Sequence, residues 1–326
     1  MAIFNLLHRE FNEEDEFHTN STRFVFKEGV LRQVFDVGHF SQVQDTYTDY
    51  WYKSKKLWNK EGHLHNSKQV SDCLVGLKEF LSEISNLRSI LDLGCASGLT
   101  SKYVLDLFPD TRHWAGVDFN PAIFEAESNL SDFTCSREYV FGDLLSHPYE
   151  SEVDLVVCNA VLHHLPSPLE GLKAVHKALT KSGKAVGWVC SDVPIGRQET
   201  RKAIHQYIDN LPFQQALEAL RGLSELGATL GAIHQTIHID RDIAIAEIKA
   251  GTYTVHEFIN RHFLKCFYSE NCSLEMADLF NYDEYKPSFQ HRLTHGQWRK
   301  LAEQAGFSNV NVLKTTNSGF TLYLTK

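Results

Sequence analysis

The chain has 326 residues and a hydrophobic content of 43%, which is enough for one large or two small globular domains with a buried core. Its formal net charge is −9, and acidic and basic residues are interspersed without a long basic run, which argues against a nucleic-acid substrate. The seven cysteines are odd in number and none forms a Cys-x-x-Cys pair, which favours a reducing, cytoplasmic compartment.

Residues 1–88 are expected to form an N-terminal extension of helices and loops. The start of the chain lacks the basic segment and the cleavage site of a signal peptide, and no stretch is apolar enough to span a membrane. We therefore expect neither targeting nor membrane contact. Within the extension, Tyr50, Trp51 and Tyr52 are candidates for a lid over a bound ligand, and packing of these aromatic side chains onto the core is the alternative.

Residues 89–192 alternate short apolar runs with amphipathic segments, which is typical of a parallel sheet with helices on both faces. The predicted strands are 89–94, 113–118, 138–142, 153–158 and 184–191. Helical periodicity follows the first, second and fourth of these strands, and two of the helices begin at a proline. The segment thus predicts an α/β core.

Residues 193–290 are predicted to be a mostly helical insertion after the fifth strand. Such an insertion would cover the ligand edge of the sheet as a substrate lid, or supply the surface of a homodimer. His234 and His238 are predicted four residues apart on a helix, a spacing that suits a pair of metal ligands. No sharper ligand pattern accompanies them, so no metal is predicted.

Residues 291–326 return to the α/β pattern. A helix that is capped by Thr294 and ended by Gly306 precedes two strands joined by a tight turn at 316–319. A turn this short makes the last two strands antiparallel to each other. We expect this segment to complete the core.

The turn after the first predicted strand carries Asp92, Gly94 and Gly98, and Asp118 ends the second strand. A glycine-rich turn at this place presents backbone N–H groups to a ligand at the carboxyl edge of the sheet. The loop lacks the G-x-G-x-x-G pattern, which disfavours a nicotinamide-dependent oxidoreductase. The Asp118 carboxylate suits a ribose, because it can accept a hydrogen bond from each of two hydroxyls.

In the order and spacing of these motifs, the chain resembles the class I S-adenosylmethionine-dependent methyltransferases, from Ser89 to Asp192 and over the C-terminal helix and strand pair. The resemblance implies a doubly wound, mostly parallel sheet of seven strands with an antiparallel last strand, together with the N-terminal helical extension and the helical insertion. It also implies S-adenosylmethionine as cofactor and S-adenosylhomocysteine as product.

The resemblance also assigns cofactor-binding roles. Asp118 would bind the ribose, with Phe119 beside the adenine and Asp143 at its amino group. The other implied residues are Gly94, Cys95, Ala96 and Gly98 in the loop, and Asn159 and Ala160 at the exit of the fourth strand. Asp92 either braces the loop or accepts from the cofactor's ammonium group, and Asp143 has the alternative of capping the helix that follows it. Ala96 stands where the family often has a glycine.

Three histidines are candidates for a catalytic base. His163 and His164 follow the fourth strand at the carboxyl edge, and His291 precedes the last helix. Bracing of the loop by bonds to backbone groups, or packing at the helix entry, is the alternative role for these rings. Tyr285 and His295 are candidate substrate contacts.

These features predict an enzyme that transfers a methyl group to an oxygen, or a nitrogen, of a small molecule such as a specialised metabolite. A methyltransferase of protein or tRNA is an alternative within the same chemistry. A non-catalytic protein that binds S-adenosylmethionine or S-adenosylhomocysteine is an alternative of another class. Methyl transfer requires mainly positioning of the acceptor and exclusion of water, because the sulfonium methyl is already activated.

Overall fold

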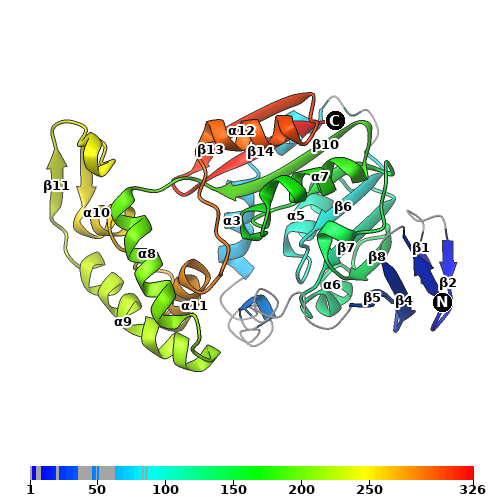
Figure 1. The fold of residues 1–326 in the computed structure, drawn as a ribbon, viewed down its shortest axis with the longest axis horizontal. Helices are drawn as coiled ribbons and strands as arrows, with labels where there is room; N and C mark the ends of the chain where they lie inside the picture. The colour runs from blue at the N-terminus through cyan, green and yellow to red at the C-terminus, as the bar shows by residue number, and fades with distance from the viewer. Residues whose placement is uncertain are drawn as a thin grey trace. The chain divides into compact units, whose positions relative to one another are not determined.

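The computed structural model describes residues 2–4, 9–19, 22–35, 46–48, 50, 63–82, 84 and 87–326 (Figure 1). The chain forms two compact units. Unit 1 comprises residues 1–44, 64–191 and 289–326, and unit 2 comprises residues 45–63 and 192–288. Residues 45–63, which the sequence assigns to the N-terminal extension, therefore group with the segment 192–288.

The main sheet of unit 1 has the strand order β13-β14-β10-β9-β6-β7-β8-β5-β4-β3. Its strands are β3 (Glu16–His18), β4 (Arg23–Lys27), β5 (Val30–Gln33), β6 (Ser89–Leu93), β7 (His113–Asp118), β8 (Ser136–Phe141), β9 (Val153–Val157), β10 (Leu179–Cys190), β13 (Asn309–Thr316) and β14 (Gly319–Thr325). Neighbouring strands from β10 to β5 pair in parallel, and β14 is antiparallel to both β10 and β13. The predicted mostly parallel sheet with an antiparallel last strand is confirmed.

Alternation along the strands separates two apolar layers. Ile90 belongs to one buried cluster and Leu91 to the other, because successive side chains of a strand point to opposite faces. The Ile90 face packs against α3 (His63–Cys73), α5 (Leu99–Leu107) and α6 (Ile123–Asn129), and the Leu91 face packs against α7 (Pro168–Ala178) and α12 (His295–Gln304). Helices on both faces make the sheet doubly wound. The short helix α4 (Leu77–Leu81) also packs with the first group.

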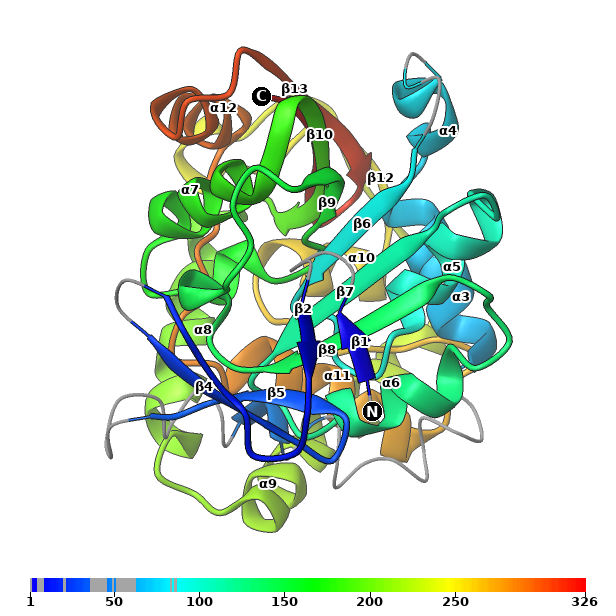
Figure 2. The ribbon, with the colours of Figure 1, turned by 90° about the vertical axis from the view of Figure 1, so that its right-hand side faces the viewer.

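The predicted helical extension is wrong for the first part of the chain, and the sheet has ten strands instead of seven. β5, β4 and β3 continue the sheet beyond β8, as Figure 2 shows for β4 and β5. β1 (Ala2–Phe4) and β2 (Arg9–Phe11) form a separate antiparallel pair. The physical reason is visible in β4, where Phe24 and Phe26 alternate with exposed or half-buried residues and are fully buried in the core.

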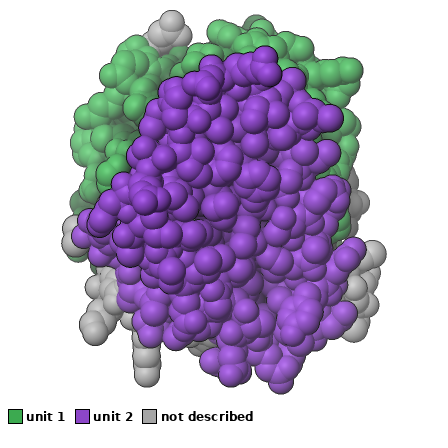
Figure 3. Space-filling model, turned by 90° about the vertical axis from the view of Figure 1, so that its left-hand side faces the viewer, with its two compact units in different colours: residues 1–44, 64–191, 289–326 green, residues 45–63, 192–288 purple. Residues whose placement is uncertain are grey.

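Unit 2, drawn in purple in Figure 3, is mostly helical. Its helices are α8 (Ile195–Ile208), α9 (Phe213–Gly231), α10 (Val255–His262) and α11 (Leu274–Tyr285). Its core includes Ile208, Leu220, Leu279 and Tyr282. Strands β11 (Thr236–Ile239) and β12 (Gly251–Thr254) form an antiparallel hairpin. His234 precedes this hairpin and His238 lies on β11, so their predicted placement on one helix is wrong.

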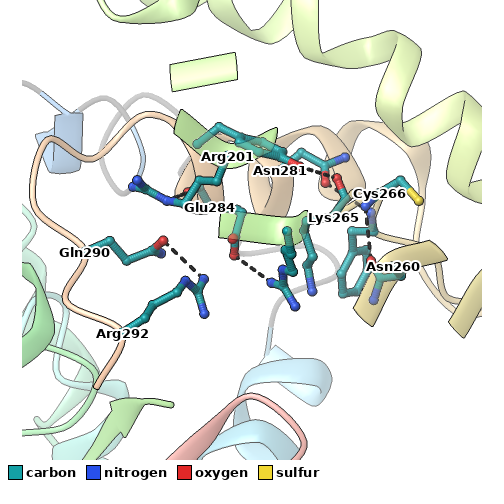
Figure 4. A network of polar contacts seen from close by, with 11 residues as sticks. Arg201, Asn260, Lys265, Cys266, Asn281, Glu284, Gln290 and Arg292 are labelled. Atoms are coloured by element: carbon teal, nitrogen blue, oxygen red, sulfur yellow. Dashed lines mark hydrogen bonds and ion pairs between the residues drawn. The ribbon is translucent and has the colours of Figure 1, made fainter. Parts of the chain in front are cut away.

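Buried polar contacts stabilise unit 2 around α11 (Figure 4). The carboxylate of Glu284 forms an ion pair with Arg197 of α8 at 3.1 Å, and both side chains are more than nine-tenths buried. The Arg201 guanidinium donates to the Glu284 carbonyl oxygen at 3.0 Å. Charges at this depth are tolerated because each has a partner.

Within the described ranges, no helix is long and apolar enough to cross a membrane. Nor do the described side chains include a group of three histidine, cysteine, aspartate or glutamate residues that could hold a metal ion.

Candidate functional site

The carboxyl ends of four neighbouring strands lie at one edge of the unit 1 sheet. Leu93 of β6 pairs with Val117 of β7, and Asp118 pairs with Phe141 of β8. On the other side, Asp92 pairs with Val157 of β9. Because these strands are parallel and in register, the turns that follow them meet at this edge, where open α/β sheets bind ligands.

The β6–α5 loop depends on glycine at two positions. Gly94 has φ 84° and Gly98 has φ 81°, in the left-handed region that other residues rarely adopt. A Cβ at Gly94 would also lie 2.3 Å from the Cγ2 of Val161, which follows β9. Ala96, with φ 44°, holds the same kind of strained backbone without being glycine. The conformation of Ala96 is supported by its N–H, which donates to Asp118 at 2.8 Å.

The end of the β6–α5 loop and the first turn of α5 leave backbone donors available at this edge. In the described part of the chain, the N–H groups of Ser97, Leu99 and Thr100 have no hydrogen-bond acceptor. The first N–H groups of any helix lack an intrahelical partner and carry the positive end of the helix dipole. This turn is therefore suited to a carboxylate or another anionic group.

Asp118 connects the β6–α5 loop with the turn that follows β7. One carboxylate oxygen accepts from the N–H of Ala96, and the other accepts from the N–H of Asn120 at 2.7 Å. Burial raises the pKa of Asp118 to about 6, against the opposing effect of these backbone donors. Each carboxylate oxygen can accept more than one hydrogen bond, so capacity for a ligand's hydroxyls remains.

Asp92 is enclosed beneath the loop. Its side chain is 1% exposed and accepts from the Ser101 hydroxyl of α5 at 2.5 Å. Burial raises the pKa of Asp92 to about 7, and the nearby Asp118 adds to this effect. These contacts favour the loop-bracing role, which was the alternative to a direct bond with the cofactor.

Asp143 follows β8 and is held from two directions. Its carboxylate accepts from the N–H of Leu145 at 3.0 Å and so caps the short helix η3 (Leu144–Ser146). Its own N–H donates to Oε1 of Gln33 at 2.7 Å. The capping alternative for Asp143 is therefore present in the structure. Gln33 was missed, because its position comes from the pairing of β5 with β8 and has no local sequence signal.

The remaining predicted cofactor residues line the turns after β6, β7 and β9. Asn159 donates to the Thr100 hydroxyl and accepts from the N–H of Trp188, each at 3.3 Å. Ala160 is exposed with φ 60°, and Phe119 is half-buried after Asp118. Cys95 is buried in the loop. The predicted cofactor residues thus come from neighbouring turns of one edge.

Comparison with known families agrees with this arrangement. The family model described as "Methyltransferase domain" matches residues 91–185. The chain contains a methyltransferase domain. The match runs from within β6 to within β10, and it confirms the predicted resemblance for this segment.

Several curated methyltransferases are similar in sequence to part of the chain. The tRNA U34 carboxymethyltransferase of Helicobacter pylori (strain Shi470) is 28% identical over 144 residues, which are 42% of this chain and 54% of that protein. The mitochondrial ubiquinone biosynthesis O-methyltransferase of Schizosaccharomyces pombe is 26% identical over 182 residues, 51% of this chain and 60% of that protein. Trans-aconitate 2-methyltransferase of Escherichia coli O1:K1 is 33% identical over 114 residues, which are 35% of this chain and 43% of that protein. The chain spans about half the length of the curated relatives it matches.

Solved structures of methyltransferases are also similar. The 1,6-didemethyltoxoflavin-N1-methyltransferase of Burkholderia thailandensis has a TM-score of 0.45 and 10% identity, covering 96% of this chain and 99% of that one. Human N-acetylserotonin methyltransferase has a TM-score of 0.41 and 15% identity, covering 83% and 57% of the two chains.

Two of the candidate bases lie in η4 (Leu162–His164), within the methyltransferase domain, and the third is bonded to it. The N–H of Cys190 donates to Nδ1 of His163 at 3.4 Å, so this ring is neutral and carries its proton on Nε2. Burial lowers the pKa of His163 well below its ordinary value. The lone pair of the neutral ring, on Nδ1, already accepts the hydrogen bond from Cys190, which disfavours His163 as a base.

His164 and His291 have the opposite arrangement. Nδ1–H of His164 donates to the carbonyl oxygen of Phe289 at 3.0 Å, which leaves the lone pair of the neutral ring on Nε2. Nε2–H of His291 donates to the carbonyl oxygen of Leu165 at 3.0 Å, which leaves its lone pair on Nδ1. Both bonds brace the loops at the edge of the methyltransferase domain, as the alternative role predicts.

The predicted substrate and lid residues are distributed over both units. Tyr50 and Tyr285 are buried in the core of unit 2, where the Tyr285 hydroxyl donates to the carbonyl oxygen of Lys265 at 2.8 Å. His295, in unit 1, donates through Nε2 to the carbonyl oxygen of Val312 at 3.0 Å. Trp51 and Tyr52 lie outside the described residues.

Proposed function

We propose that the protein is an S-adenosylmethionine-dependent methyltransferase that acts on an oxygen, or a nitrogen, of a small molecule. The observation that carries the proposal is the carboxyl edge of the methyltransferase domain. There, N–H groups at the start of α5 have no acceptor among the described residues, the loop before α5 is bonded to Asp118, and Asp143 follows β8.

The residues present fit this cofactor. The N–H groups of Ser97, Leu99 and Thr100 offer donors for the carboxylate of its methionine part. Asp118 retains acceptor capacity for the ribose hydroxyls, and the Asp143 carboxylate offers an acceptor for the adenine amino group. When bound, the cofactor supplies an activated methyl group. The chain then has to orient the acceptor, exclude water and remove one proton.

Proton removal is assigned to His164 or His291. Each ring donates through one nitrogen to a backbone carbonyl oxygen, which sets the orientation of the ring and places the lone pair of the neutral ring on the other nitrogen. A base is needed for a hydroxyl acceptor, so these two rings favour oxygen as the first choice. His163 would position η4, because its Nδ1 is bonded to Cys190 of β10.

A small-molecule acceptor is favoured over tRNA by the charge of the chain. At −9, with interspersed charges, the protein would repel a polyanion, and binding of tRNA would need a strong local basic patch. Two of the relatives named above carry small molecules in their names, and one carries tRNA. A tRNA acceptor is therefore the second candidate.

The test is transfer of a labelled methyl group from S-adenosylmethionine to fractionated small molecules, bulk tRNA and bulk protein. Label in a small-molecule fraction supports the proposal, and label in tRNA or protein replaces it with the second candidate. Binding of the cofactor without label in any fraction would make the protein a non-catalytic binder. The variants His164→Gln and His291→Gln should lower turnover, whereas His176→Gln, near the end of α7 and in edge contact with the Phe307 ring, should not.

We also propose a cytoplasmic homodimer that associates through unit 2. All seven cysteines are free thiols, which supports a reducing compartment. Between α8 and α9 lies an apolar groove of about 280 Å³, where Tyr207 is 74% exposed. Sedimentation should give a dimer for the native chain and a monomer for Tyr207→Ser. A native monomer would refute this part.

A further inference from the structure

Strand β5 brings a residue from outside the methyltransferase domain to the carboxyl edge. It pairs in parallel with β8 through Leu31 opposite Val140 and Arg32 opposite Phe141. In the sheet, β5 lies between β8 and β4 (Figure 2). The next residue of β5 is Gln33, which therefore lies at the level of Gly142, immediately before Asp143.

The side chain of Gln33 fits closely against this turn. Its Oε1 accepts from the N–H of Asp143 at 2.7 Å. A Cβ at Gly142 would lie 2.8 Å from that Oε1 and 3.0 Å from the Cβ of Gln33, so the contact requires a glycine there. Among the described residues, the Nε2 group of Gln33 has no hydrogen-bond acceptor, which leaves two donors on a fixed amide.

These contacts determine where the Asp143 carboxylate lies. On one side it accepts from the N–H of Leu145, and on the other its backbone is held by Gln33. A side chain that reads a ligand has to be held within a fraction of an ångström by its neighbours. Without the Gln33 bond, the N–H of Asp143 would lose its acceptor and the turn after β8 would be free to shift.

We propose that Gln33 is a positioning residue for the adenine end of the cofactor site. By holding the backbone of Asp143, it keeps the carboxylate where it accepts from the adenine amino group. The inference rests on the proposed function, because it concerns the same cofactor. It makes preference for an adenine base depend on a strand that precedes the methyltransferase domain by more than fifty residues.

The experiment measures two dissociation constants by calorimetry, for S-adenosylhomocysteine and for its analogue with hydrogen in place of the 6-amino group. The native chain should prefer S-adenosylhomocysteine by about tenfold, the effect expected for a hydrogen bond to a charged group. Gln33→Met, which keeps the side-chain length but removes both polar groups, should reduce this preference to about twofold. Gln304→Met, an exposed glutamine of α12, is the matched control and should keep the native preference.

Each outcome decides a separate question. An unchanged preference in Gln33→Met would overturn the inference, because a merely structural role lowers both affinities equally. Equal binding of the two ligands by the native chain would also overturn it, while leaving the cofactor site intact. Binding of neither ligand would remove the proposed function itself. If Gln33→Met does not fold, Gly142→Ala displaces the Gln33 amide from the other side and should reduce the preference in the same way.

Discussion

The buried carboxyl group of Asp92 should make the stability of unit 1 depend on pH. Its pKa is raised from 3.8 to about 7, chiefly because burial disfavours the charged form. The folded chain therefore binds more protons than the unfolded chain between pH 4 and 7. In this window the contribution of Asp92 to the free energy of unfolding falls as the pH rises. Above pH 7, Asp92 is ionised in the folded chain and destabilises it by the full cost of burying the charge.

The size of this penalty follows from the two pKa values. A difference of about 3 in pKa corresponds to about 4 kcal/mol at about 1.4 kcal/mol per unit. Between pH 5 and pH 8, Asp92 should lower the free energy of unfolding by about 3 kcal/mol. Other groups titrate in this range, among them buried histidines that act in the opposite direction, so the native chain alone does not isolate the effect.

The variant Asp92→Asn does isolate it. An asparagine keeps an oxygen that can accept from the Ser101 hydroxyl, but it carries no charge. Urea unfolding of both proteins at pH 5 and pH 8 gives two differences in stability. The difference should move by about 3 kcal/mol in favour of the variant at pH 8. A difference that is the same at both pH values, within about 1 kcal/mol, would refute the view that Asp92 is ionised at a cost.

Three further outcomes are expected. Asp118→Ala should weaken S-adenosylhomocysteine binding at least about tenfold, as measured by calorimetry. Because burial raises the pKa of Asp118 to about 6, binding by the native chain should also weaken below pH 6, and an affinity that does not change with pH would contradict this. Gly94→Ala should destabilise the chain by about 1–3 kcal/mol, because the added Cβ would meet Val161. Adding Val161→Ala should restore part of that loss. A double variant that is no more stable than Gly94→Ala would mean that the backbone strain at position 94 dominates. Glu284→Gln should cost about 3–5 kcal/mol in unfolding experiments by leaving the Arg197 guanidinium buried and unpaired, and a near-neutral result would show that the pair is hydrated.

The sequence was sufficient for elements with strong local patterns. β7 begins and ends at its predicted residues, because its apolar run is buried on both faces and bounded by turn residues. Thr294 caps α12 through a reciprocal pair of bonds with Gln297, as its position before the helix indicated. Such features depend on neighbours in the chain and are therefore visible in sequence.

Features that depend on distant pairing were not predictable in this way. β3 has only three residues, too few to show a period of two, and it is a strand because β4 supplies its partner. Gln33 acquires its role from a bond to a residue 110 positions away. Likewise, Nδ1 of His163 accepts from the N–H of Cys190 on another strand, whereas Nδ1 of His164 donates to a carbonyl oxygen. The two adjacent histidines in the sequence give no local sign that their rings are protonated at different nitrogens.

The measurement that tests the cofactor site most directly is thermal stabilisation of the purified protein by S-adenosylmethionine, S-adenosylhomocysteine, NAD and NADP, each at saturating concentration. A ligand at a hundred times its dissociation constant should add about 2.7 kcal/mol if it binds only the folded chain. Stabilisation by the two adenosyl compounds alone is the predicted result. Stabilisation by a nicotinamide cofactor alone would contradict the assignment of the loop from Gly94 to Gly98, and the proposed methyl transfer would fall with it.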